Sequence, residues 1–264
     1  MIDTYKALIL AIIEGFTEFL PISSTAHLLF AAKILDFTSI PNHSFEIIIQ
    51  LAAILPLFII YRDDLFNPLK NLSKKNNRDF YLKFFIALLP IVLIGGYFGS
   101  FIKAKIFDIK FIASSLILGG VIMVFIEKLL PKSDIKKIDQ IGFKKSFYIG
   151  LFQVFALIPG MSRAGSSIIG AMILGVDRLT AAKFSFFLAI PTICAATVYD
   201  IYKNYHNFVF DDILILTIGF VMTFFTAYLV ILNFTRIMSS LGFKIIGAYR
   251  ILIGSVMFIW NYWF

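Results

Sequence analysis

The sequence predicts an all-α integral membrane protein with two inverted-topology repeats, each a re-entrant hairpin of broken helices followed by three transmembrane helices. Three observations support this fold class: the composition, two proline breaks that precede short apolar segments, and a weak internal repeat. The chain of 264 residues is 59% hydrophobic and 15% charged, with a mean hydropathy of +0.89, whereas soluble domains average about 45–50% and about 25%. We expect a single membrane domain, 1–264, with repeat one at about 1–130 and repeat two at about 144–264.

Ten apolar segments follow one another along the chain, and six of them approach the length of a full membrane span. The hydrocarbon core of a bilayer is about 30 Å thick and a helix rises about 1.5 Å per residue, so segments 24–35 and 165–176 are too short to cross. The expected segments are 4–20, 24–35, 45–61, 83–102, 111–130, 146–158, 165–176, 183–202, 212–234 and 245–263.

Each of the two short segments follows a proline break. Pro21 precedes the first and Pro159-Gly160 precedes the second. Proline interrupts a helix because it lacks an N–H group and its ring clashes with the preceding turn. Broken helices of this kind build binding sites near the middle of the membrane in transporters. We therefore expect two re-entrant hairpins, one from each face, whose tips meet and form a composite site.

The two breaks also align with each other as an internal repeat. Phe19 to Ser24 can be placed over Leu157 to Ser162, an offset of 138 residues (157 − 19). Downstream, Leu55-Pro56 corresponds to Ile190-Pro191, and Leu118 to Val121 corresponds to Ile253 to Val256, both at an offset of 135 (190 − 55; 253 − 118). Each half holds three full spans, and an odd number of crossings inverts the second half relative to the first. The repeat is therefore expected to have inverted topology.

The charge pattern and the cysteine content exclude two classes of function. The formal charge of +8 does not indicate nucleic-acid binding, because the basic residues gather between apolar segments, where the positive-inside rule accounts for them. The single cysteine, Cys194, excludes an intramolecular disulfide and gives no support for redox chemistry.

The same rule predicts the orientation of the chain: two connections are expected to be cytoplasmic, and both termini are expected to lie outside. The basic residues of the first connection are Arg62, Lys70, Lys74, Lys75, Arg78 and Lys83, and those of the second are Lys128, Lys132, Lys136, Lys137, Lys144 and Lys145.

The first hairpin carries two carboxylates inside apolar sequence. Glu14 and Glu18 are four residues apart and therefore project from one face of a helix. A charge near the bilayer centre costs roughly 2.5–3.5 kcal/mol, so such residues usually mark a site for ions, protons or polar substrates. Their repulsion is relieved by a divalent cation, by a cationic partner, or by one carboxyl that keeps its proton. The alternative is that both lie near the outer interface and are simply solvated.

Hydroxyl groups and an imidazole follow Pro21. Ser23, Ser24 and Thr25 can bind a substrate, or they can serve only as N-caps of the short helix that follows. His27 can be a packing histidine, but a titratable imidazole this close to Ser24 and Glu18 favours a working site.

The second hairpin combines an arginine with small and hydroxylated residues at the start of a helix. Ser162, Arg163, Gly165 and Ser166 follow the break. Backbone N–H groups at a helix N-terminus favour negative charge, and a guanidinium binds phosphate oxygens in bidentate fashion. The sequence therefore predicts an anion site at this tip. Alternatively, or in addition, Arg163 pairs with Glu14 or Glu18 and neutralises it.

These residues resemble the undecaprenyl-diphosphate phosphatases, also called bacitracin-resistance proteins, over the whole chain. The family pattern is a glutamate-rich segment running into Pro-x-Ser-Ser-Thr-Gly-His, present here from Glu14 to His27, and Pro-Gly-x-Ser-Arg-Ser-Gly, present here from Pro159 to Gly165. Two positions depart from it: Ala26 replaces a glycine, and Ala164 replaces a serine and is given no catalytic role. Supporting positions that match are Phe45, Glu46, Gln50, Leu51, Gln153, Ala156 and Leu157.

The resemblance implies hydrolysis of a polyprenyl (C55) diphosphate lipid to undecaprenyl phosphate and inorganic phosphate, which recycles the lipid carrier of cell-wall synthesis and confers bacitracin resistance. It implies a divalent cation, Mg²⁺ or Ca²⁺, and an outward-facing active site in a multi-pass protein of the bacterial cell membrane. A homodimer is left open. The expected catalytic residues are Glu18, Ser24, His27 and Arg163; substrate binding is expected at Ser23, Thr25, Ser162, Gly165, Ser166 and Gln153; and the expected metal ligands are Glu14 and Glu18.

The mechanism expected for this site has Ser24 attacking the terminal phosphorus while His27 or a glutamate takes its proton. Attack by His27 itself, or by water that His27 activates, is the alternative. A second function class also fits the architecture, because a transporter or flippase of polyprenyl phosphates would use inverted repeats, Arg163 and the glutamates to bind without cleaving. A purely structural scaffold would leave the buried charges unexplained.

Overall fold

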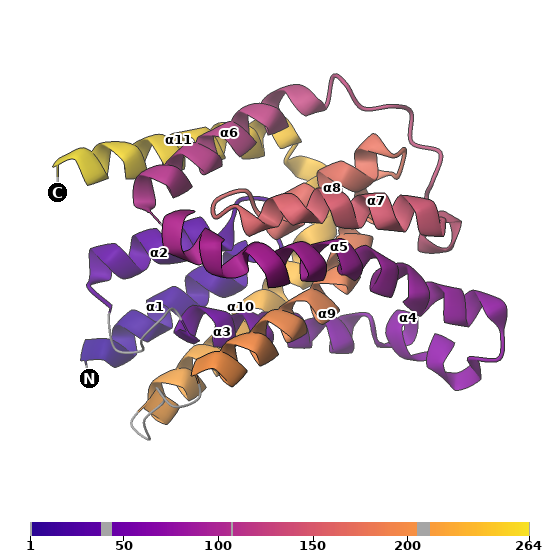
Figure 1. Cartoon of the computed structure of the whole chain (residues 1–264), viewed down its shortest axis with the longest axis horizontal. Helices are drawn as coiled ribbons and strands as arrows, with labels where there is room; N and C mark the ends of the chain where they lie inside the picture. Colours follow the sequence, from indigo (N-terminus) through magenta and orange to yellow (C-terminus); the bar gives the residue numbers. More distant parts are fainter. Residues whose placement is uncertain (1, 38–43, 107, 205–211, 264) are drawn as a thin grey trace.

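The computed structural model describes residues 2–37, 44–106, 108–204 and 212–263, which form a bundle of α-helices with short 3₁₀ turns (Figure 1). The helices are α1 (Ile2–Thr17), α2 (Ser24–Leu35), α3 (Ser44–Ile60), α4 (Arg62–Phe66), α5 (Lys75–Ile106), α6 (Ile109–Ile126), α7 (Phe143–Gln153), α8 (Arg163–Ile173), α9 (Arg178–Asn204), α10 (Asp212–Ser240) and α11 (Phe243–Trp263), with 3₁₀ turns η2 (Pro68–Asn71), η3 (Ile138–Gln140) and η4 (Val154–Leu157).

Five of the six expected membrane spans are confirmed in place by single long helices. Within the described ranges, α5, α6, α9, α10 and α11 are long and apolar enough to cross a membrane. A sixth candidate is the pair Phe45–Ile60 and Arg62–Asn71, which bends by 87° at its break. The chain is therefore an all-helical, multi-pass membrane protein with five or six candidate spans.

The short helices form two hairpins with opposed tips. α1 and α2 pack against each other, as do α7 and α8, and the two pairs approach the middle of the molecule from opposite ends (Figure 1). α1 ends at Thr17 because Pro21, four residues later, has no N–H to donate to the Thr17 carbonyl. In the second hairpin, α7 tightens into η4 before Pro159, and Gly160 takes the left-handed φ of 97° that the turn requires.

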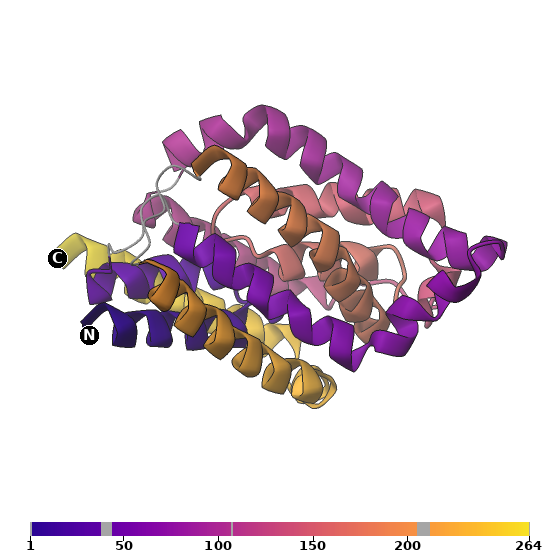
Figure 2. The same cartoon turned by 90° about the horizontal axis from the view of Figure 1, so that it is seen from below.

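The long helices enclose these hairpins. α6 and α11 form the most extensive helix pair and lie side by side along one edge, while α10 packs against α1 and α3 and α5 packs against α7 (Figures 1 and 2). Phe19, at the first tip, meets Phe186 of α9 edge to face at 4.9 Å, and Phe186 meets Phe234 of α10 at 4.5 Å. Such aromatic pairs contribute about 0.5–1.5 kcal/mol each beyond area burial. This buried aromatic cluster fixes the position of the first tip against α9 and α10.

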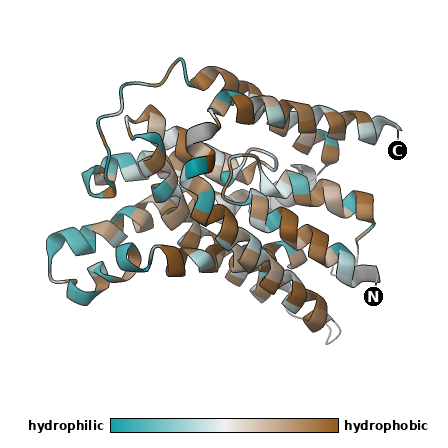
Figure 3. Ribbon diagram, turned by 180° about the vertical axis from the view of Figure 1, so that it is seen from behind, coloured by the Kyte–Doolittle hydropathy of each residue, from teal (hydrophilic) through white to brown (hydrophobic). Residues whose placement is uncertain are grey.

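Polar residues concentrate at one end of the bundle. Figure 3 shows hydrophobic residues along the helices and hydrophilic ones near α4 and in the connection between α6 and α7. Both basic connections lie at this end, whereas α1 begins and α11 ends at the opposite end (Figure 1). The basic residues of the two connections, which the sequence predicts on the same side of the membrane, therefore lie at the same end of the bundle.

Candidate active site

Each hairpin tip carries a serine in strained backbone geometry directly before its second helix. Ser23 has φ 72° and precedes α2, and Ser162 has φ 74° and precedes α8. Non-glycine residues avoid this region, and such outliers concentrate at functional sites. Each tip therefore has one serine at positive φ, Ser23 or Ser162, whereas the sequence alignment placed Ser24 over Ser162.

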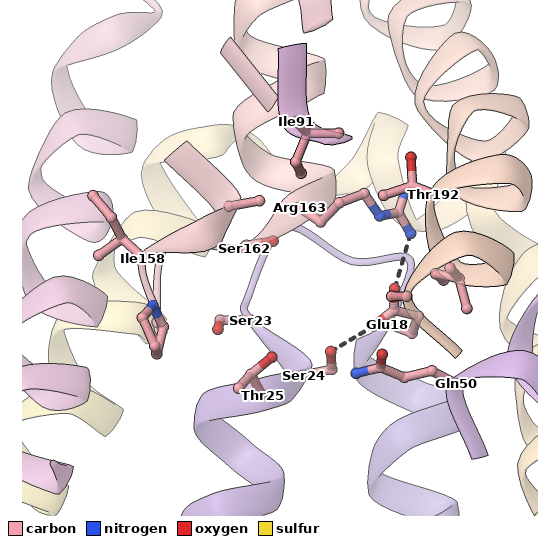
Figure 4. A pocket seen from close by; sticks show the side chains of 15 residues that line it. Glu18, Ser23, Ser24, Thr25, Gln50, Ile91, Ile158, Ser162, Arg163 and Thr192 are labelled. Carbon is pink, nitrogen blue, oxygen red and sulfur yellow. Dashed lines mark hydrogen bonds and ion pairs between the residues drawn. The ribbon is translucent and has the colours of Figure 1, made fainter. Parts of the chain in front are cut away.

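Glu18 connects the two tips. Its Oε1 accepts a hydrogen bond from Arg163 Nη2 at 2.9 Å, and its Oε2 accepts one from Ser24 Oγ at 2.5 Å (Figure 4). Both members of the ion pair are almost fully buried, with side-chain exposures of 11% and 6%. Removing one partner of a buried ion pair lowers the stability of a protein by about 3–5 kcal/mol. The predicted pairing of Arg163 with a glutamate is thus confirmed, and the partner is Glu18.

The guanidinium of Arg163 is held by several groups at once. Nη1 donates to Ser185 O at 2.9 Å and to Ser185 Oγ at 3.3 Å, and Ser167 Oγ lies 2.7 Å from Ser185 Oγ. The Phe19 ring lies 5.8 Å from the guanidinium carbon. Among the described groups, Arg163 Nε has no hydrogen-bond partner. Arg163 is therefore preorganised by α9 and the first tip and still has a donor free for an anion.

Glu14 lies one turn before Glu18 and is fully buried. Both of its carboxylate oxygens lack a hydrogen-bond partner among the described residues. A buried charge without a partner is unfavourable, so this carboxyl needs a proton or a cation. In the described part of the chain, no group of three or more His, Cys, Asp and Glu side chains forms a metal-binding cluster. Glu18 and Glu46 of α3 are carboxylates close enough to repel Glu14 electrostatically.

His27 points away from Ser24. Its Nδ1 lies 2.8 Å from Ser23 O and its Nε2 lies 2.8 Å from Tyr249 Oη, and the two rings are nearly parallel. Both ring nitrogens are therefore engaged, one with the backbone of the first tip and one with α11. Of the two bases left open by the sequence, the structure places Glu18 and not His27 on the Ser24 hydroxyl.

A cavity of about 170 Å³ lies between the tips (Figure 4). Of the expected substrate-binding residues, Ser23, Thr25 and Ser162 line it together with Glu18, Ser24 and Arg163. Gln50, one of the supporting positions, also lines the cavity. The geometry thus gathers a buried ion pair, a hydrogen-bonded serine and further hydroxyl groups around one cavity.

Three expected binding residues have other contacts. Ser162 Oγ accepts the Gly165 N–H at 3.0 Å, so Ser162 is an N-cap of α8, and Ser166 Oγ donates to Ser162 O at 2.9 Å. Gln153 is buried and donates to Thr192 Oγ1 at 3.3 Å, and Thr192 in turn lines the cavity. Ser23, by contrast, occupies the N-cap of α2 without a side-chain capping bond in the described structure. Its hydroxyl therefore has no capping bond that would compete with a ligand.

Arg250 of α11 is a site residue that the sequence reasoning missed. It is fully buried, and its guanidinium donates to Pro21 O at 3.0 Å in the first tip and to Gly160 O at 2.9 Å in the second. Gly119 of α6 makes room for it, because a Cβ there would lie 2.2 Å from Arg250 Nη2. The available signal was an arginine inside a full-length apolar segment, the same signal that singled out Glu14 and Glu18.

Replacing Arg250 with methionine is expected to destabilise the fold by about 3 kcal/mol, because buried carbonyls at both tips lose a charged donor. The measurement is the thermal unfolding temperature in detergent. Arg62→Met is the matched control, since the Arg62 side chain is 75% exposed and pairs with the neighbouring Asp63 on the surface. Equal melting temperatures for Arg250→Met and the wild type would show that the tips do not depend on Arg250.

Comparison with known proteins identifies the chain's relatives. Residues 7–256 match the family model described as bacitracin resistance protein BacA. The chain is 40% identical over 255 residues to an undecaprenyl-diphosphatase of Parvibaculum lavamentivorans, covering 96% of this chain and 95% of the relative. It is 43% identical over 258 residues to an undecaprenyl-diphosphatase 2 of Pseudoalteromonas translucida, covering 97% of both. The chain belongs to the BacA family of bacitracin resistance proteins.

Proposed function

We propose that this chain hydrolyses undecaprenyl diphosphate to undecaprenyl phosphate and inorganic phosphate, and so recycles the lipid carrier of cell-wall synthesis in the bacterial cell membrane. Membership of the BacA family and full-length relatives named undecaprenyl-diphosphatase support this activity. The observation that carries it is the continuous chain of hydrogen bonds from Ser24 through Glu18 to Arg163 beside a cavity between the tips.

The cavity suits a diphosphate because it combines a cation with hydroxyl donors. Arg163 brings a fixed positive charge, and Ser23 and Thr25 bring hydroxyls from the opposite tip. Phosphoryl transfer depends mainly on positioning and on neutralising charge on the transferred group. A site buried between helices makes such electrostatic contacts stronger than they are in water. We therefore assign Arg163 to binding the oxygens of the terminal phosphate. The hydroxyls of Ser23 and Thr25 are assigned to orienting that phosphate.

Ser24 is assigned as the nucleophile and Glu18 as its base. Ser24 Oγ forms a bond to the terminal phosphorus while the bond from that phosphorus to the bridging oxygen breaks, which releases undecaprenyl phosphate. The Ser24 proton passes to Glu18 Oε2, which already accepts it at 2.5 Å. Water then attacks the phosphoserine, and inorganic phosphate leaves as the Ser24 hydroxyl is restored. His27 holds the Ser23 carbonyl and thereby the geometry of the tip.

Glu14 and Glu18 fit a divalent cation, Mg²⁺ or Ca²⁺. The orphaned oxygens of Glu14 provide ligands, and Mg²⁺ is typically held by one or two carboxylates together with substrate phosphates. When bound, such an ion polarises phosphoryl oxygens. Glu14 would hold it, and Glu18 would share its carboxylate between the ion, Arg163 and Ser24.

We further propose two inverted repeats, 1–130 and 144–264, with re-entrant hairpins at α1–α2 and α7–α8. Packing between the two halves supports this, because α1 of the first half packs against α10 of the second, and α7 of the second half packs against α5 of the first. The matching left-handed serines at both tips support it as well. Both basic connections lie at the same end of the bundle, which favours a cytoplasmic position for that end. The entrance to the site would then face outward at the opposite end.

Phosphate release from undecaprenyl diphosphate by the purified chain tests the activity. We expect turnover in detergent that falls after chelation of divalent cations and returns with Mg²⁺ or Ca²⁺. Binding of the lipid without phosphate release, whatever the cation, would replace the hydrolase with a carrier of polyprenyl phosphates.

Replacing Ser24 with alanine is expected to lower kcat by about 10³-fold or more, since removal of a nucleophile leaves only the contribution of the surrounding electrostatics. The measurement is single-turnover phosphate release, together with a search for labelled phosphoserine in the wild type. Ser114→Ala is the control, because Ser114 lies on α6 and donates to Lys110 O in its own helix. Turnover near the wild-type rate in a folded Ser24→Ala variant would favour water or His27 as the nucleophile.

A further inference from the structure

A second, larger cavity adjoins the candidate active site. It measures about 430 Å³ and lies between α5 and α9. Ile91, Thr192 and Ala196 line both cavities, so the two spaces share a wall. We call this second space the α5–α9 groove.

The groove is lined almost wholly by apolar groups and kept open by glycines. Gly95, Gly96 and Gly99 form its α5 side. A Cβ built on Gly96 or Gly99 would meet no atom within 4 Å, so the space above both glycines is empty. Asp200 and Lys203 appear only at the far end. A diphosphate would find no compensating donors along most of this surface, and its charge would be expensive to desolvate there.

The shape of the groove suits a linear apolar chain. On α9 it extends from Thr192 to Lys203, a rise of eleven residues (203 − 192), or about 16 Å of helix. Both flanking helices are candidate membrane spans, and apolar side chains beside the groove, such as Leu93 at 68% and Val198 at 67% exposure, face outward. A chain that starts in the polar cavity can thus follow the groove and continue into lipid.

We propose that the α5–α9 groove binds the isoprenoid units next to the diphosphate of the substrate. This proposal rests on the proposed function, because the occupant is the tail of the lipid whose diphosphate lies between the tips. The shared wall at Ile91, Thr192 and Ala196 joins the two parts of one ligand. Burial of the first units in the groove contributes to affinity and to the preference for long prenyl chains.

The double variant Gly96→Leu/Gly99→Leu tests the groove, since a Cβ at either position meets open space. Leucine also has a higher helix propensity than glycine. Phosphate release is measured with undecaprenyl diphosphate and with a C5 prenyl diphosphate, whose tail is too short to reach these residues. We expect KM for the long lipid to rise about tenfold or more, as loss of two buried methylene contacts predicts. For the C5 substrate, kcat/KM should stay unchanged.

Gly142→Leu is the matched control, because a Cβ at Gly142 also meets no atom within 4 Å and this residue lies before α7, outside the groove. A parallel loss for both substrates would mean that the groove admits the head group, and no change for either would mean that the tail lies elsewhere; both results overturn the proposal. No phosphate release by the wild type from either substrate would instead refute the proposed function.

Photo-crosslinking gives an independent readout that does not need turnover of the C5 compound. A polyprenyl diphosphate that carries a diazirine on its second isoprene unit is expected to label peptides containing residues 91–99 and 192–203. Labelling confined to other helices would contradict the proposal, whatever the kinetics.

Discussion

Replacing Arg163 with lysine is expected to lower kcat/KM for phosphate release by about 10³-fold, the lower end of what an arginine contributes when it neutralises a transferring phosphoryl group. Lysine keeps the charge but not the planar set of donors. In the wild type that set serves Glu18 and Ser185 at the same time and leaves Nε free. An ammonium group can satisfy only part of this arrangement, so we expect a catalytic loss with the fold retained.

Arg178→Lys is the matched control for Arg163→Lys. Arg178 also pairs with a glutamate, Glu127, and stacks on an aromatic ring, Phe243, but it lies outside the cavity. Both variants are measured with undecaprenyl diphosphate at saturating cation, alongside their melting temperatures. Equal kcat/KM for Arg163→Lys and Arg178→Lys would remove Arg163 from the phosphate-binding role.

Replacing Glu18 with glutamine is expected to lower kcat by about 10²–10⁴-fold, the range typical for loss of a general base. Glutamine has nearly the same shape, but its amide cannot take the Ser24 proton and its interaction with Arg163 loses the charge. Single-turnover phosphate release measures the chemical step. Because Glu18 is buried, the variant's folding is checked by its melting temperature.

Glu127→Gln is the control for loss of a paired carboxylate away from the cavity. Glu14→Gln separates the roles of the two glutamates. We expect this variant to raise the cation concentration needed for half-maximal activity, because Glu14 is assigned to the cation and not to the Ser24 proton. If Glu18→Gln kept the wild-type kcat while His27→Gln lost it, the base would be His27 and the assignment to Glu18 would be wrong.

The helices could be predicted because the membrane imposes simple rules on the chain. The expected segment 24–35 agrees with Ser24–Leu35, since a proline break and a serine-rich start mark its beginning. The expected segment 83–102 is shorter than α5, Lys75–Ile106, because a helix can continue through polar residues beyond the apolar stretch. The 87° bend after Ile60 was not foreseen, because the expected apolar segment ends at residue 61 and the charged residues that follow do not by themselves predict another helix.

The candidate site could be predicted only in part. Composition and motif identified Glu18, Ser24 and Arg163, because charges and hydroxyls are conspicuous in apolar sequence. The partner of His27 could not be predicted, since Tyr249 lies 222 residues away and nothing local links them. The same holds for the carbonyls that Arg250 contacts in both tips. Long-range packing of α11 decided both contacts.

A double-mutant cycle between Glu18→Gln and Arg163→Lys tests the central claim that the two tips form one hydrolytic site. The quantity measured is kcat/KM for phosphate release from undecaprenyl diphosphate in the wild type, both single variants and the double variant. Residues that act as one unit are strongly non-additive. We expect the double variant to be within about tenfold of the worse single variant. Losses that multiply would show that the two residues act independently, and would contradict a shared site.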